Sequence, residues 1–133
     1  MRRRYLFAAL PLLGLAACQT PGMASRPASR TVVYFTADSA MLDENATALV
    51  EDVAERAKTM GSAPVRVRGF AAPDATSSPA FNRSLAESRT RIVADQLVAG
   101  GIDRSRIRLQ PRGAVPFEQM AIESRRVEIL IGE

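Results

Sequence analysis

One arginine stands apart from the other ionisable residues because of the helix face on which it lies. Arg89 follows Leu85 by four residues and precedes Val93 by four, so it projects from the apolar side of a predicted helix. An unpaired guanidinium buried there would cost several kcal/mol. A carboxylate, backbone carbonyls or an anionic ligand must therefore meet it. Spacing alone leaves these partners open, and also leaves open a side chain that reaches the helix surface.

The remaining composition excludes most catalytic chemistry. The 133 residues include no His and a single Cys, Cys18. Without His there is no Ser-His-Asp or Cys-His system and no imidazole ligand, and one Cys forms neither an intrachain disulfide nor a zinc cluster. No pair of carboxylates stands out as the acid and base of a glycosidase. We therefore expect no enzymatic activity, no cofactor and no metal.

The first seventeen residues have the pattern of an export signal. Residues 2–4 are all Arg, and residues 5–15 form an apolar run too short to span a membrane, which takes about 20 residues. Leu15-Ala16-Ala17-Cys18 resembles the lipobox of bacterial lipoproteins. The resemblance implies that Cys18 becomes the first mature residue and is acylated, and that Gln19, in place of Asp, directs the protein to the outer membrane. The alternative is ordinary cleavage that leaves Cys18 as a free thiol.

A tether and one domain follow the signal. Residues 18–30 begin at the lipidated cysteine and continue as a segment rich in Pro, Gly and Ser, which is typical of a flexible linker. The twelve residues 19–30 reach about 40 Å when fully extended. Residues 31–133 form the predicted folded domain.

Strand and helix patterns alternate along that domain. β-Branched runs and alternating apolar positions predict strands, while apolar residues at helical spacing, with caps at Asp43 and Ser78, predict two main helices. The result is an α/β fold, a β-α-β-α-β-β sandwich in which the two helices cover a small mixed sheet. The predicted strands are 31–35, 65–70, 107–109 and 127–131, the helices are 44–60 and 79–99, and a short helical turn is expected within 117–122.

Four short motifs in this domain resemble the OmpA-like C-terminal domain family, which includes the peptidoglycan-associated lipoproteins. That family shows F-x-x-x-S-A-x-L, G-x-T-D, N-x-x-L-S-x-x-R-A-x-x-V and N-R-R-V in this order. The resemblance covers 31–133 and implies noncovalent binding of the diaminopimelate of peptidoglycan stem peptides between an aspartate and the helical arginine. The matching residues are Phe35, Ser39-Ala40, Leu42, Gly69-Phe70, Asn82, Leu85, Arg89, Val93 and Arg125-Arg126-Val127-Glu128.

Not all of the family's ligand residues have a clear counterpart in this sequence. Arg89 and Asn82 fall on the family's helical pattern without a gap. Counting forward from the G-x-T-D motif puts Ala72 at the aspartate position, whereas counting backward from the helix gives Asp74, fifteen residues before Arg89. A loop can absorb two extra residues and a helix cannot, so Asp74 is the predicted partner.

The arginine pair near the carboxyl end has two equally weighted interpretations. Arg125 either contacts the ligand or is a charge on the surface or sheet edge. Ser124 precedes it where the family has Asn.

Two functions remain open at this point. The first is a peptidoglycan-binding outer-membrane lipoprotein, lipid-anchored with its domain in the periplasm, that links the membrane to the cell wall. The second is a degenerate domain without wall binding that serves as an interaction or assembly module for envelope proteins. Nucleic acid is not an expected partner, because removing residues 1–17 lowers the net charge from +4 to +1.

Overall fold

The computed structural model describes residues 28–73, 77–116 and 118–132. Cys18, Asp74 and the predicted export signal lie outside them. The predicted order of strands and main helices is confirmed, but some bounds differ. The first strand starts two residues earlier than expected, the third strand continues to Ala114, and the helical turn is a short 3₁₀ helix at Ala121–Ser124. The elements are β1 (Ser29–Tyr34), α1 (Glu44–Thr59), β2 (Val65–Ala71), α2 (Pro79–Ala99), η1 (Arg104–Arg106), β3 (Ile107–Ala114), η2 (Ala121–Ser124) and β4 (Arg126–Ile131).

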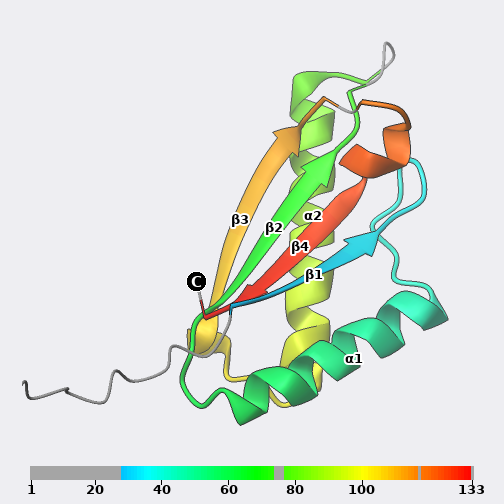
Figure 1. The fold of residues 1–133 in the computed structure, drawn as a ribbon. Coiled ribbons are helices and arrows are strands. Elements are labelled where there is room, and N and C mark those ends of the chain that lie inside the picture. Colours follow the sequence, from blue (N-terminus) through cyan, green and yellow to red (C-terminus); the bar gives the residue numbers. More distant parts are fainter. Residues whose placement is uncertain (1–27, 74–76, 117, 133) are drawn as a thin grey trace, which may run out of the picture.

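The four strands form one mixed sheet in the order β1-β4-β2-β3 (Figure 1). Strand β4 is antiparallel to both β1 and β2, and β3 is parallel to β2. Because β1 and β2 therefore run in the same direction, their carboxyl ends lie at one end of the sheet. The segments that follow these two strands meet there.

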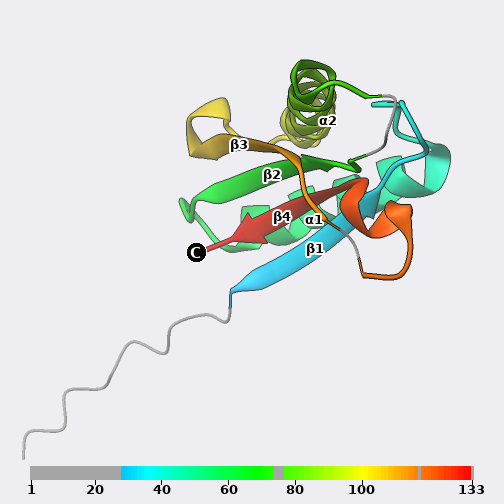
Figure 2. The same cartoon turned by 90° about the horizontal axis from the view of Figure 1, so that it is seen from above.

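Both helices pack on the same face of the sheet (Figure 2). The core lies between them and that face, and apolar side chains from the helices and the sheet are buried in it. The opposite face is left without either helix. The core residues include Val50, Val53, Ala57, Val93 and Leu97 from the helices and Val33, Val65, Val67, Val127, Ile129 and Ile131 from the sheet.

Local sequence sets both helix starts. The Asp43 carboxylate accepts a hydrogen bond from the Ala46 N–H at 2.7 Å. The Ser78 hydroxyl accepts one from the Phe81 N–H at 3.1 Å, and Pro79 occupies the first turn of α2. These caps fix the register of α2, and hence the direction in which its side chains project.

A glycine allows α2 to lie close against β2. A Cβ atom added to Gly69 would stand 2.0 Å from the Thr90 Oγ1 and 2.4 Å from the Ala86 carbonyl oxygen. Neither distance is possible for a real side chain, so the close approach requires Gly at this position. The close approach also places Arg89, the residue before Thr90 on α2, against the ends of β1 and β2.

Candidate functional site

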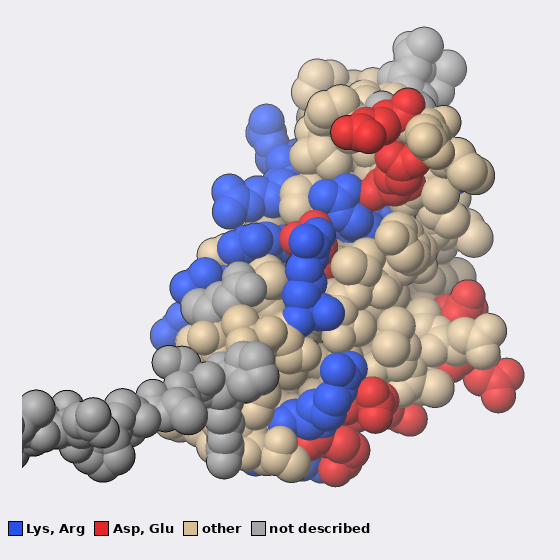
Figure 3. Space-filling view, in the orientation of Figure 1, with Lys and Arg blue, Asp and Glu red and all other residues tan. Residues whose placement is uncertain are grey.

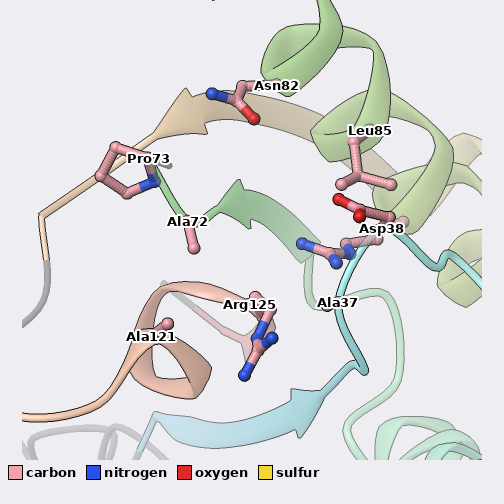
Figure 4. A pocket seen from close by; sticks show the side chains of 9 residues that line it. Ala37, Asp38, Ala72, Pro73, Asn82, Leu85, Ala121 and Arg125 are labelled. Carbon is pink, nitrogen blue, oxygen red and sulfur yellow. The ribbon is translucent and has the colours of Figure 1, made fainter. Parts of the chain in front are cut away.

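A pocket of about 160 Å³ lies at the end of the sheet where β1 and β2 terminate. Side chains from α2, from the segment after β1, from the end of β2 and from the region of η2 surround it (Figure 4). Three of the residues predicted from the sequence, Asn82, Arg89 and Arg125, are brought together here. The lining residues are Ala37, Asp38, Ala72, Pro73, Asn82, Leu85, Arg89, Ala121 and Arg125.

The Arg89 side chain is fully buried at 0% exposure and is held by backbone carbonyls. Its Nε donates to the Ser39 carbonyl at 2.8 Å, and its two terminal nitrogens donate to the carbonyls of Phe70 and Thr36 at 3.0 Å each. Of the partners considered for this guanidinium, the structure shows carbonyls. Because a guanidinium carries five N–H groups, two are not engaged by the described residues.

The surroundings of Arg89 perturb its ionisation without neutralising it. Burial lowers the pKa of the Arg89 guanidinium to about 10, the nearby charge of Arg125 acts in the same direction, and Asp38 acts against both. The guanidinium carbon also lies 5.2 Å from the centre of the Phe35 ring. Arg89 therefore stays positively charged at neutral pH.

Asp38 supplies a carboxylate that the sequence analysis did not assign to the site. It lies in the turn after β1 with a positive φ of 51°, a conformation that Asp adopts more readily than most residues. The carbonyls on either side of it, from Thr36 and Ser39, are the ones that Arg89 holds. Arg89 thus positions the turn that carries Asp38 at the pocket.

A topological signal could have pointed to Asp38. An Asp directly after a strand whose carboxyl end lies beside that of β2 belongs at the same end of the sheet. That inference requires the strand order β1-β4-β2, which the local pattern does not contain.

The backbone of Arg125 is held by hydrogen bonds on both sides. Its N–H donates to the Ile122 carbonyl at 3.0 Å and its carbonyl accepts from the Phe35 N–H at 2.8 Å. The Nε is buried without a partner in the described part of the chain. The neighbouring Arg126 instead binds the Glu128 carboxylate at 2.9 Å and lies over the Phe70 ring, so the two arginines have different environments.

The other predicted site residues have separate outcomes. Asn82 is buried at the pocket. Asp74 lies outside the described residues, although Pro73, immediately before it, lines the pocket. Cys18 also lies outside them. Neither role is tested by the structure, and both remain predictions.

The pocket places opposite charges around a small volume. A carboxylate such as that of Asp38 can bind the ammonium group of a ligand, and a guanidinium can bind a ligand carboxylate through parallel hydrogen bonds. This arrangement suits a zwitterionic amino acid centre. A second groove of about 680 Å³ shares Ala37 and Arg125 with the pocket and is also lined by Tyr34, Met41 and Ile122.

Other site types find no counterpart in the described ranges. No group of three His, Cys, Asp or Glu side chains there could hold a metal ion. No helix within the same ranges is long and apolar enough to cross a membrane.

Fold and pocket define a two-layer α/β domain with a charged pocket at one end of its sheet. The chain belongs to the OmpA family, whose sequence profile matches residues 34–126. Outer membrane protein 40 of Porphyromonas gingivalis is 39% identical over 83 residues, which are 62% of this chain and 21% of that protein. The chain thus matches about a fifth of that relative's length.

Solved structures of other proteins share this fold. The OmpA-like domain of FopA1 from Francisella tularensis superposes with a TM-score of 0.71 and 23% identity, covering 77% of this chain and 71% of that one. The peptidoglycan-associated lipoprotein from Burkholderia pseudomallei gives 0.66 and 19%, covering 75% and 88%. The periplasmic domain of Helicobacter pylori MotB gives 0.66 and 18%, covering 79% and 74%. At these identities the likeness shows the fold alone.

Proposed function

We propose that this protein is a noncatalytic, peptidoglycan-binding lipoprotein that links the outer membrane to the cell wall. Acylated Cys18 is the membrane anchor, and the domain lies in the periplasm. The observation that carries the wall-binding role is the pocket, which is lined by one carboxylate, Asp38, and two guanidinium groups, Arg89 and Arg125.

The proposed ligand is the free amino acid centre of diaminopimelate in a stem peptide. Its ammonium binds a carboxylate, and its carboxylate binds Arg125 together with the remaining N–H groups of Arg89. The adjoining groove gives room for the rest of the stem peptide. The name of the similar Burkholderia protein, a peptidoglycan-associated lipoprotein, supports this ligand class.

Two carboxylates compete for the role of the ammonium partner. Asp38 lines the pocket, while Asp74 has the sequence spacing of the family's aspartate. Asp74 directly follows Pro73, whose ring restricts the backbone of this loop. Substituting each aspartate in turn distinguishes the two candidates.

The direct test is co-sedimentation of the full chain with purified sacculi. If one carboxylate alone binds the ammonium, its variant, Asp38→Asn or Asp74→Asn, should weaken pelleting about tenfold; if both contribute, each variant should show part of that loss. Asp95→Asn changes an exposed carboxylate on α2 and should leave pelleting unchanged. Free diaminopimelate should compete, whereas 1,5-diaminopentane, which has the two ammonium groups but neither carboxylate, should compete poorly. Normal pelleting of both site variants would contradict the proposed clamp.

A degenerate domain without wall binding is the second candidate. The observation in its favour is that Arg89 already has three carbonyl partners and needs no ligand for its charge to be met. Failure of the unmodified chain to pellet with sacculi would support this alternative. Cys18 is tested separately by labelling with a palmitate analogue, which a Cys18→Ala chain should not incorporate.

A further inference from the structure

The sheet face that carries neither helix is rich in arginine. Five arginines and a single carboxylate lie on this face of the described strands. Strand register places Arg66 of β2 directly beside Arg108 of β3, and Arg68 beside Gln110. We call Arg30, Arg66, Arg68, Arg108 and Arg126 the arginine face.

The one carboxylate of this face is already occupied. Glu128 is 5% exposed, and one of its oxygens binds Arg30 at 2.7 Å and Arg126 at 2.9 Å. Arg68 donates only to the Gln110 side chain and Arg108 to a backbone carbonyl. Within the described residues, three of the five guanidinium groups therefore have no carboxylate partner.

This arrangement works against the sheet that carries it. Like charges directly opposite each other on neighbouring strands destabilise the pairing, and Arg66 and Arg108 are such a pair. To stay solvated, a sheet face needs only a mixture of positive and negative side chains. A cluster that conflicts with local stability is typical of a binding surface.

Acidic side chains gather elsewhere on the molecule. Four of them, Glu44, Glu51, Asp52 and Glu55, are exposed on α1, which packs on the other face of the sheet. Figure 3 shows blue side chains over the region of β2 and β3, with red ones mainly near the upper end and the region of α1. The modest net charge of the chain thus conceals a separation of charge that would orient the domain at an anionic surface.

We propose that the arginine face binds the phosphate groups of anionic phospholipids on the membrane that holds the lipid anchor. Guanidinium groups pair well with phosphate, and an array spread over a four-stranded sheet suits a surface of headgroups. The position of the tether rests on the proposed function: residues 19–28 lead directly into β1, where Arg30 belongs to the face. These ten residues reach about 33 Å when fully extended, which is enough to reach this surface, and the short tether keeps the local lipid concentration high.

Membrane binding of this kind leaves the pocket uncovered. The pocket is lined by α2 residues such as Asn82 and Leu85, whereas the arginine face is on the side of the sheet without helices. One side of the domain can therefore contact the membrane while the pocket holds the wall.

The test is co-sedimentation of the full chain carrying Cys18→Ala, so that no acyl chain contributes. Vesicles of phosphatidylcholine alone are compared with vesicles that also contain phosphatidylglycerol, and the amino-terminal residues are common to every variant. We expect binding to the anionic vesicles to weaken about 30-fold in Arg66→Gln/Arg108→Gln, which is about 1 kcal/mol for each arginine near the surface. It should also weaken as salt is raised.

The matched control removes the same charge from α2. Arg83→Gln/Arg91→Gln changes two exposed arginines on the helix and should keep nearly full vesicle binding. Equal loss in the two double variants, or no binding of the parent chain to anionic vesicles, would overturn the proposal.

Wall binding is measured in parallel to keep the two proposals apart. Arg66→Gln/Arg108→Gln should pellet with sacculi like its parent and should unfold at no lower denaturant concentration, because a repulsion is removed. If it lost sacculi while the parent chain ignored vesicles, the arginine face would belong to the wall site and membrane binding would be wrong. Loss of sacculi binding in every chain would overturn only the proposed function.

Discussion

Arg89 and Arg125 line the same pocket, but the chain holds them in different ways. Arg89 is fully buried and donates to three carbonyls, two in the loop after β1 and one in β2. Arg125 is half-buried, has its backbone fixed on both sides, and leaves its Nε without a partner in the described residues. The difference indicates that Arg89 is mainly part of the fold, with two N–H groups left for a ligand, whereas the Arg125 side chain serves chiefly the ligand.

This division has a structural consequence for the opposite charge in the pocket. The carbonyls that Arg89 binds flank Asp38, so the buried arginine maintains the turn that presents the carboxylate. Binding and stability are therefore coupled on the α2 side of the pocket. On the side of η2, where Arg125 lies, the two should separate.

The largest expected effect comes from Arg89→Met, which keeps an unbranched side chain but removes every donor. Three carbonyls lose their partner, and at about 1 kcal/mol or more each the free energy of unfolding should fall by about 3 kcal/mol. Urea unfolding of the full chain measures it. Arg89→Lys keeps the positive charge and can still donate a hydrogen bond to one of the carbonyls, so it should recover part of the lost unfolding free energy. A stability change below about 1 kcal/mol in Arg89→Met would mean that water replaces the guanidinium at little cost.

The contrast between the two arginines also shows what the sequence could predict. Helical spacing is local, so the position of Arg89 on the apolar face of α2 followed from the positions of Leu85 and Val93. Asn82 was assigned to the site only through the family resemblance. The order of strands and helices followed from similarly local patterns. The carbonyl partners of Arg89 did not, because main-chain oxygens of distant loops leave no mark in the pattern of side chains.

Asp38 and Arg125 were harder to predict for a nonlocal reason. In the sequence, Asp38 looks like a residue that simply ends a strand. Only the sheet order, which puts the carboxyl ends of β1 and β2 at the same end of the sheet, indicates that Asp38 belongs to the site. Arg125 and Arg126 read as one basic pair, yet Arg125 lines the pocket and Arg126 binds Glu128. The spacing argument for Asp74 concerns a residue outside the described ranges, so its role remains a prediction.

An intermediate effect is expected from Arg125→Gln, and its neighbour supplies the control. Loss of a charged hydrogen bond to the ligand should weaken binding to sacculi about 10- to 100-fold, while the unfolding free energy changes by less than about 1 kcal/mol. Arg126→Gln removes a partner of the nearly buried Glu128 carboxylate and should do the reverse, lowering stability more than binding. The same pattern in both variants would remove the distinction between a ligand arginine and a structural one.

The smallest effect is expected at Glu123, which organises the segment beside Arg125. Its two carboxylate oxygens accept the N–H groups of Glu118 and Met120 at 3.0 Å each. These bonds, that from Glu118 first, hold the pKa of Glu123 below its ordinary value of 4.5. A carboxylate with a lowered folded pKa stabilises the fold above its ordinary pKa, and this contribution is lost as the pH falls through the folded value. Glu123→Ala should therefore be slightly less stable than the parent chain at neutral pH, and the two should converge in acid, as the pH falls through the lowered folded pKa of Glu123. Urea unfolding at both pH values measures this, with Glu87→Ala, an exposed change on α2, as the control. A stability difference that stayed constant with pH would show that Glu123 acts through packing and not through its charge, and Arg125 would then owe its position to the backbone bonds alone.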